Sequence, residues 1–112
     1  MKKVEVIVDP SQVGAVRDLL GRVGVDGMSV SEVRDLDEHK CHIELYRGFE
    51  SRISFQPKMK VEIVVEDGRI PMLVDEIYRT IRSGWIRDGK IVVVPMDDAV
   101  RVRTGERGND AI

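Results

Sequence analysis

The sequence predicts an α+β domain of the ferredoxin-like type, with the element order βαββαβ and a long loop between the second and third strands. The main observation is an internal repeat. Residues Lys3–Val8 read KVEVIV, and Lys60–Val65 repeat them as KVEIVV. Each copy is followed by a helical pattern, then by an Asp-Gly pair and a further valine-rich segment. Two βαβ halves of this kind form one antiparallel sheet with both helices on the same face.

In the first half, the β-branched residues of Lys3–Val8 predict a strand. Asp9 can cap a helix and Pro10 suits its first position. The apolar stripe of this helix consists of Val13, Val16, Leu19, Leu20 and Val23, and Gly24 ends it. The Asp26-Gly27 pair then leads into a second strand at 28–34.

In the second half, Lys60–Val65 is the third strand. The stripe of the second helix consists of Leu73, Val74, Ile77 and Ile81, Gly84 ends it, and the fourth strand is expected at 90–94. Valines occur on both sides of the strands, so the sheet face opposite the helices should be covered. A symmetric homo-oligomer is the simplest cover.

Length and composition favour one globular domain spanning 1–112. The chain has 112 residues, of which 42% are hydrophobic and 34% charged. Its formal net charge of −2 argues against broad nucleic-acid binding. We see no signal peptide and no apolar run near the roughly 20 residues that span a bilayer. The single cysteine fits a reducing compartment. We therefore expect a cytoplasmic protein without membrane insertion.

The interval 36–57 is much longer than a hairpin needs, and connections of this length are usually functional or mobile. Tyr46 and Phe49 stand out in this polar stretch as anchors for a protein partner. The interval also contains three potential metal ligands within four residues, His39, Cys41 and His42. Mobile loops hold such residues without a metal, and no fourth ligand is evident, so a metal site here is the weaker reading.

The C-terminal segment 100–112 is expected to be a strand followed by a tail. Arg101 and Arg103 alternate with valines, so both would point to one face of an extended segment. Guanidinium groups bind phosphate oxygens bidentately. Thr104 begins a turn at the following glycine. Taken alone, this pattern also fits a solvated strand edge with a frayed terminus.

The turn at Asp88, Gly89 and Lys90 adds to the arginines. A glycine turn exposes backbone N–H groups, and a lysine follows it directly. Together with Arg101 and Arg103 it supplies three cations and a set of backbone donors, which suits a di- or triphosphate. A plain hairpin turn is the alternative for the Asp-Gly pair alone.

Several separated motifs, in order, resemble the PII nitrogen-regulatory signal-transduction family. They are Glu44–Gly48 (ELYRG), Lys58–Val65 (KMKVEIVV), Asp88–Ile91 (DGKI) and Arg101–Gly108 (RVRTGERG), and Gly24–Val30 (GVDGMSV) is similar too. The likeness runs from Lys2 to Ile112.

This resemblance implies a homotrimeric regulator rather than an enzyme. Such proteins bind ATP or ADP in clefts between subunits, often with 2-oxoglutarate beside the ATP-bound Mg²⁺, and the long T-loop docks on a target protein. Carried over by position, the nucleotide-binding residues are Gly27, Met28, Ser29, Glu62, Val64, Asp88, Gly89, Lys90, Arg101, Arg103 and Thr104. Glu38, His39, Lys40 and Lys58 form the loop base, and Tyr46, Phe49 and Ser51 lie in the target-binding loop.

The chain departs from the family at the loop base, which commonly reads Gly-Arg-Gln-Lys-Gly and here reads Asp37–Cys41 (DEHKC). Glu38 replaces an arginine near the phosphates and would repel them. His39 replaces the glutamine that completes the 2-oxoglutarate site, although Mg²⁺ prefers oxygen ligands. Ser51 replaces the uridylylated tyrosine, which excludes uridylylation there. Arg87 replaces a common glycine, and would contact phosphate or face solvent.

These departures indicate a paralogue with an altered effector or target. They argue against the standard response to Mg·ATP and 2-oxoglutarate, whereas binding of ADP or AMP depends less on the loop base. Two alternatives stay open: a sensor of another small molecule, such as AMP or bicarbonate, and a metal-binding ferredoxin-like trimer. The sequence names neither the target, whether enzyme, transporter or regulator, nor the pathway.

Overall fold

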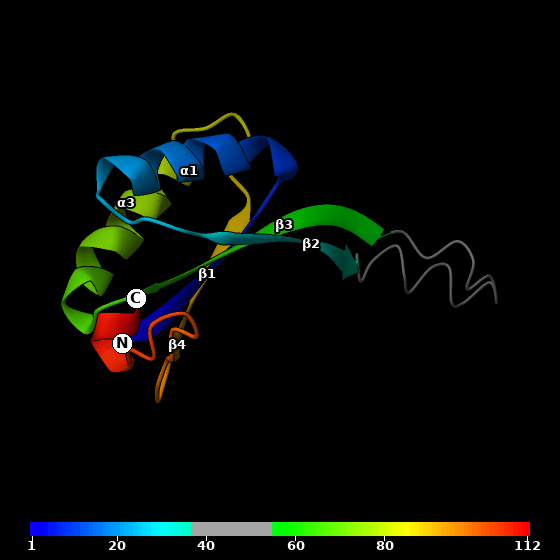
Figure 1. Cartoon of the computed structure of the whole chain (residues 1–112). Coiled ribbons are helices and arrows are strands. Elements are labelled where there is room, and N and C mark those ends of the chain that lie inside the picture. Colours follow the sequence, from blue (N-terminus) through cyan, green and yellow to red (C-terminus); the bar gives the residue numbers. More distant parts are fainter. Residues whose placement is uncertain (37–54) are drawn as a thin grey trace.

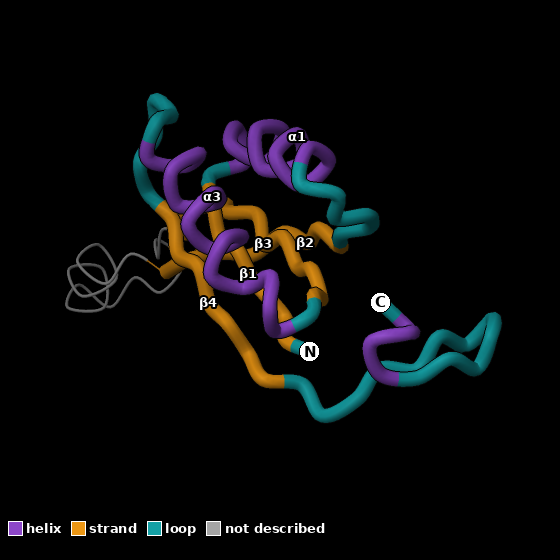
Figure 2. Tube along the Cα trace, turned by 90° about the vertical axis from the view of Figure 1, so that its left-hand side faces the viewer, coloured by secondary structure: helices purple, strands orange, loops and turns teal. Residues whose placement is uncertain are grey.

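The structure, a computed structural model, describes residues 1–36 and 55–112. A four-stranded antiparallel sheet of order β2-β3-β1-β4 carries both helices on one face (Figure 1, Figure 2). The strands are β1 (Lys2–Val8), β2 (Ser29–Leu36), β3 (Phe55–Val65) and β4 (Gly89–Pro95), and the helices are α1 (Val13–Arg22) and α3 (Ile70–Arg82). The predicted ferredoxin-like order of strands and helices is confirmed.

The core lies between the sheet and the two helices. Val4, Val6 and Val8 of β1 alternate along the strand and are fully buried. The stripes predicted for the helices meet them from above. The buried core residues are Val4, Val6, Val8, Val16, Leu19, Leu20, Val61, Ile63, Val65, Leu73, Ile77 and Ile81. Both periodicities read from the sequence, two in the strands and 3.6 in the helices, therefore point to this one core.

Each helix begins after a short 3₁₀ turn, η1 (Pro10–Gln12) before α1 and η3 (Asp67–Arg69) before α3. The Asp9 carboxylate caps η1 by accepting a hydrogen bond from the Ser11 amide at 2.9 Å. The last residue of each turn reaches across the molecule. The Gln12 amide donates to the Ile86 carbonyl at 2.7 Å, and the Arg69 guanidinium donates to the Val23 carbonyl.

The open face of the sheet, opposite the helices, carries a charged centre. Glu5 and Glu62 are direct partners across β1 and β3. Lys3 lies 3.4 Å from both carboxylates, and Lys60 lies 3.8 Å from Glu5 and 3.6 Å from Glu62. Like charges directly opposite each other destabilise a sheet, and the two lysines neutralise this pair. The open face is thus less apolar than the valine-rich surface that the sequence predicted.

The hairpin strands are longer than predicted. β2 continues through Leu36 and β3 begins at Phe55, with Leu36 and Phe55 as register partners. The predicted loop of 36–57 therefore loses one residue to β2 and three to β3, and the interval between the strands is 37–54. Cross-strand pairing simply continues beyond the part of the sheet that the helices cover. Within the described ranges, no helix has the length and apolar character needed to cross a bilayer.

The prediction of an extended strand at the start of 100–112 is wrong. Only an isolated bridge joins Val100 to Arg107, and a turn lies between them. The Arg101 amide donates to the Glu106 carbonyl at 2.9 Å, and the Gly105 amide donates to the Arg101 carbonyl at 2.7 Å. Gly105 has a φ of 76°, which a glycine adopts without strain and which reverses the chain. The segment ends in the 3₁₀ turn η4 (Gly108–Ala111), and Ile112 lines a hollow with Gly24 and Arg69, whereas the turn before η4 projects away from the helices (Figure 2).

Candidate functional site

The first cluster, here called the loop-end cluster, consists of Lys58, Asp88, Gly89 and Lys90. It lies at the end of the sheet from which β2 and β3 run toward 37–54 (Figure 1). The Lys58 ammonium is 3.0 Å from Asp88 Oδ2, and the Gly89 amide donates to Asp88 Oδ1 at 2.9 Å. A hollow of about 130 Å³ is lined by these four residues together with Ile7 and Asp35.

Gly89 determines where Lys90 stands. Its φ is 154°, and a Cβ at this position would lie 2.8 Å from the Ile7 carbonyl oxygen. Because that oxygen belongs to the backbone of the neighbouring strand, a larger residue would push β4 away from β1. Glycine allows the close approach, so that Lys90 pairs in register with Ile7 on the open face.

The Lys58–Asp88 pair was not predicted from the sequence, which gave both residues to the site without joining them. Lys58 is 8% exposed, whereas the side chain of Asp88 is 75% exposed. The hydrogen bond from Lys58 is the main cause that lowers the pKa of Asp88, and the charge of Lys58 adds to it. The cluster therefore presents a largely buried ammonium that is already held by an internal carboxylate, with Lys90 exposed beside it.

The second cluster, here called the tail-end cluster, lies at the opposite end of the sheet. It consists of Gly27, Met28, Ser29, Glu62 and Val64. Ser29 and Glu62 are register partners, and Val64 follows on the same open face. Val64 also lines a hollow of about 330 Å³ with Asp26 and Ile112 among its other residues. Met28 instead packs against the hydrophobic core.

The two clusters cannot form one compact site within a single chain. Lys58 and Val64 are six residues apart on the same strand, which corresponds to roughly 20 Å. The tail with Arg101 and Arg103 follows β4 at the same end as Val64, far from the loop-end cluster (Figure 1). The structure thus divides the nucleotide-binding residues predicted from the sequence into two groups at opposite ends of one sheet.

The tail arginines are arranged differently from one another. The Arg101 guanidinium donates to the Ala111 carbonyl at 3.1 Å, which fastens η4 to the turn. Arg103 is exposed on the turn itself. The Thr104 hydroxyl donates to the Glu106 carboxylate at 2.7 Å. The extended strand predicted from the sequence includes none of these contacts.

The remaining predicted residues lie in 37–54, outside the described part of the chain. They are Glu38, His39, Lys40, Cys41, His42, Tyr46, Phe49 and Ser51. The metal site, the loop base and the target anchors therefore stay predictions. Among residues 1–36 and 55–112, no group of three or more His, Cys, Asp or Glu side chains is placed to hold a metal ion.

Comparison with known proteins decides the family. The profile of the family described as "Nitrogen regulatory protein P-II" matches residues 1–106. The chain belongs to the P-II family. The P-II protein of Azospirillum brasilense is 43% identical and that of Synechocystis sp. 46% identical, each over 112 residues and the whole of both chains. The crystal structure of Arabidopsis thaliana PII bound to citrate matches with a TM-score of 0.77 at 39% identity, covering 99% of this chain and 91% of that one.

Membership of the P-II family, a family of nitrogen regulatory signal-transduction proteins, confirms the resemblance predicted from the motifs. The structural match also agrees with the four antiparallel strands and two helices described above.

The Lys58–Asp88 pair of this P-II protein predicts a pH-dependent stability. Because the pKa of Asp88 is lowered in the folded state, the pair stabilises the fold above the unfolded value of 3.8 and is lost as the pH falls through the lower folded value. We expect Asp88→Asn to reduce the free energy of unfolding near pH 7 by about 1 kcal/mol, a figure kept small because the carboxylate is largely exposed to solvent.

Urea unfolding of both proteins at a series of pH values checks this. The difference between wild type and Asp88→Asn should be constant near neutrality and should shrink below about pH 4. A difference that persisted at pH 2, or that grew on acidification, would contradict the assignment. Asp18→Asn, on the exposed surface of α1, serves as the matched control.

Proposed function

We propose that this P-II protein is a homotrimeric adenine-nucleotide sensor. It binds ATP or ADP, and AMP as a weaker alternative, in clefts between neighbouring chains. Nucleotide binding then controls a protein target, an enzyme, transporter or regulator, through the T-loop between β2 and β3. The proposal joins the predicted nucleotide residues to the family that the comparisons identify.

The separation of the two clusters is the observation that carries this proposal. Lys58 and Lys90 supply cations and the turn at Gly89 supplies backbone donors at one end of the sheet. The tail-end cluster offers the Ser29 hydroxyl and the Glu62 carboxylate, groups that can hydrogen-bond a base or a ribose. Each cluster holds half of what a nucleotide needs, so the loop-end cluster of one chain would complete the tail-end cluster of the next.

The tail strengthens this arrangement. Its internal hydrogen bonds give it a defined shape, and its turn projects away from the helices of its own chain (Figure 2). A preformed arm loses little conformational entropy when it docks. Arg103, exposed on the turn, is then available to a phosphate held by a neighbour's Lys90. Arg101 stabilises the turn through its hydrogen bond to the Ala111 carbonyl until it binds phosphate instead.

Regulation would act through Lys58. This residue lies on β3, three residues after the start of the strand that leads out of the T-loop. A bound anion would compete with Asp88 for the Lys58 ammonium, because one ammonium forms close ion pairs with few carboxylate or phosphate groups at once. Exchange of that partner would alter the base of the T-loop, and nucleotide affinity and target affinity would be coupled reciprocally.

Calorimetry with ATP, ADP and AMP, each with and without Mg²⁺ and 2-oxoglutarate, tests the proposal. We expect saturable binding of ADP and ATP at about 1 mM or below, and only a small gain in ATP affinity from 2-oxoglutarate because His39 replaces the family's glutamine. Absence of adenine-nucleotide binding at millimolar concentrations would overturn the nucleotide proposal. A large, Mg²⁺-dependent gain from 2-oxoglutarate would overturn the inference drawn from His39.

A further inference from the structure

We propose that the groove between α3 and β4 is a second binding site, specific for a small carboxylic acid with an apolar body. The groove lies on the helix side of the sheet, because Ile91 at its base pairs in register with the buried Val6. Lys90 of the loop-end cluster and Glu62 and Val64 of the tail-end cluster face the other side of the sheet, whereas Gly89 of the loop-end cluster lines both hollows. The groove therefore adjoins the loop-end cluster at Gly89 and lies on the opposite face of the sheet from Lys90.

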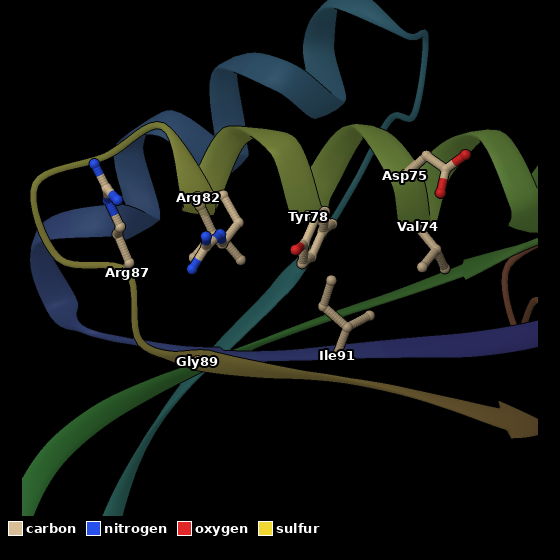
Figure 3. Close-up of a pocket in the computed structure, with 8 residues that line it drawn as sticks. Val74, Asp75, Tyr78, Arg82, Arg87, Gly89 and Ile91 are labelled. Carbon is tan, nitrogen blue, oxygen red and sulfur yellow. The ribbon is translucent and has the colours of Figure 1, made fainter.

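The body of the groove is apolar and large enough for a small molecule. Val74 and Tyr78 of α3 point down toward Ile91 of β4 (Figure 3). Ile81 completes the apolar lining. The volume of about 500 Å³ falls within the range of roughly 300 to 1,000 Å³ that small-molecule sites occupy. Tyr78 is 57% exposed, so an aromatic ring that would normally be covered is open to a ligand.

The charged groups divide the groove into two ends. Arg82, in the last turn of α3, and Arg87, in the loop before β4, lie near Gly89 at one end (Figure 3). Asp75 lies at the other end. Neither arginine forms an ion pair within the part of the chain that the structure describes. Two arginines at one end of an apolar groove favour a ligand with a carboxylate at that end, and Asp75 at the other end disfavours the reverse orientation.

Arg82 has an ordinary reason to be where it is, since a cation at the end of a helix interacts favourably with the helix dipole. Arg87 stands in the loop before β4, not in a helix, and it brings a second guanidinium to the same end of the groove. The two arginines together, rather than either one alone, make the site prefer an anionic ligand.

Isothermal calorimetry of the assembled protein with octanoate, without nucleotide, tests the proposal. We expect octanoate to bind with a Kd of about 1 mM or tighter, which is an ordinary efficiency for a ligand of this size. Octanamide, which has the same chain without the charge, should bind at least about tenfold more weakly, because it lacks charge-assisted hydrogen bonds to the arginines.

Four variants locate the site. The double variant Arg82→Gln, Arg87→Gln should remove the preference for octanoate over octanamide, and Tyr78→Ala should weaken both ligands. Arg79→Gln, on the same helix but outside the groove and paired with Glu76, should change neither. Arg87→Gln alone, in the loop, supplies a second test if the double variant folds poorly.

The proposal is overturned if the calorimetric titration with octanoate shows no saturable binding. The same result is expected if a neighbouring copy of the chain covers the groove. Equal affinities for octanoate and octanamide in the wild type would overturn it as well, as would an equal loss of octanoate affinity in Arg79→Gln and the double variant. None of these results bears on nucleotide binding, which the calorimetry with ADP and ATP measures separately.

Discussion

Lys90→Ala and Arg103→Ala, each introduced alone, are expected to weaken ATP binding by about 10- to 100-fold, the usual cost of losing one charged hydrogen-bond donor. Lys90 belongs to the loop-end cluster and Arg103 to the tail, which stand at opposite ends of the sheet. If a nucleotide lies between neighbouring chains, the two variants damage opposite sides of the same cleft. Arg17→Ala, an exposed arginine on α1, should bind ATP as the wild type does.

Mixing the two variants separates this arrangement from a site within one chain. Unfolding and refolding an equal mixture should produce trimers in which about one quarter of all clefts combine an intact Lys90 side with an intact Arg103 side. Calorimetry should therefore recover high-affinity ATP binding at roughly that stoichiometry, although neither variant alone shows it. No recovery in demonstrably mixed trimers would mean that both residues serve the same chain or that one of them does not touch the nucleotide.

Leu73→Ala is expected to reduce the free energy of unfolding by about 3 kcal/mol, within the range of roughly 2 to 5 kcal/mol for deleting a buried leucine side chain. Leu73 is fully buried in the core between the sheet and the two helices, so its removal leaves a cavity that the rigid sheet cannot fill. Denaturant unfolding at a fixed protein concentration measures the effect, because the proposed assembly would make the apparent stability depend on concentration.

Met72→Ala provides the matched control, since Met72 is the preceding residue of the same helix and is 43% exposed. We expect it to change the stability by less than about 1 kcal/mol. Similar losses for both substitutions would contradict the assignment of Leu73 to the buried stripe of α3, because alanine is the better helix former at both positions.

The elements that a single periodicity specifies could be predicted from the sequence. The alternating valines of β1 and the stripe through Leu73, Ile77 and Ile81 each have one face that can be buried, and the structure buries that face. The open face was harder to foresee. Whether a half-exposed glutamate such as Glu5 stands alone or within a network depends on cross-strand register, which local sequence does not contain.

The candidate site, too, could be predicted only in part from the local sequence. Residue types and motifs identified Lys58, Asp88 and Lys90 as members of a site, but the ion pair between Lys58 and Asp88 joins segments that are distant in sequence. In the tail, the alternation of arginine and valine favours a strand, whereas the hydrogen bond from the Gly105 amide to the Arg101 carbonyl closes a turn. The positive φ of Gly105 reverses the chain and so overrides the strand preference of the residues before it.

Gln12 and Arg69 occupy the same position of the internal repeat, nine residues after Lys3 and Lys60. Each reaches from the start of its own helix to a carbonyl at or beyond the end of the other helix, Ile86 for Gln12 and Val23 for Arg69. The two halves of the duplication therefore fasten each other reciprocally, although the donor side chains differ. Neither half can form its hydrogen bond within itself, so an isolated βαβ fragment should not fold on its own. A substitution of either donor should reduce the stability of the half that does not contain it.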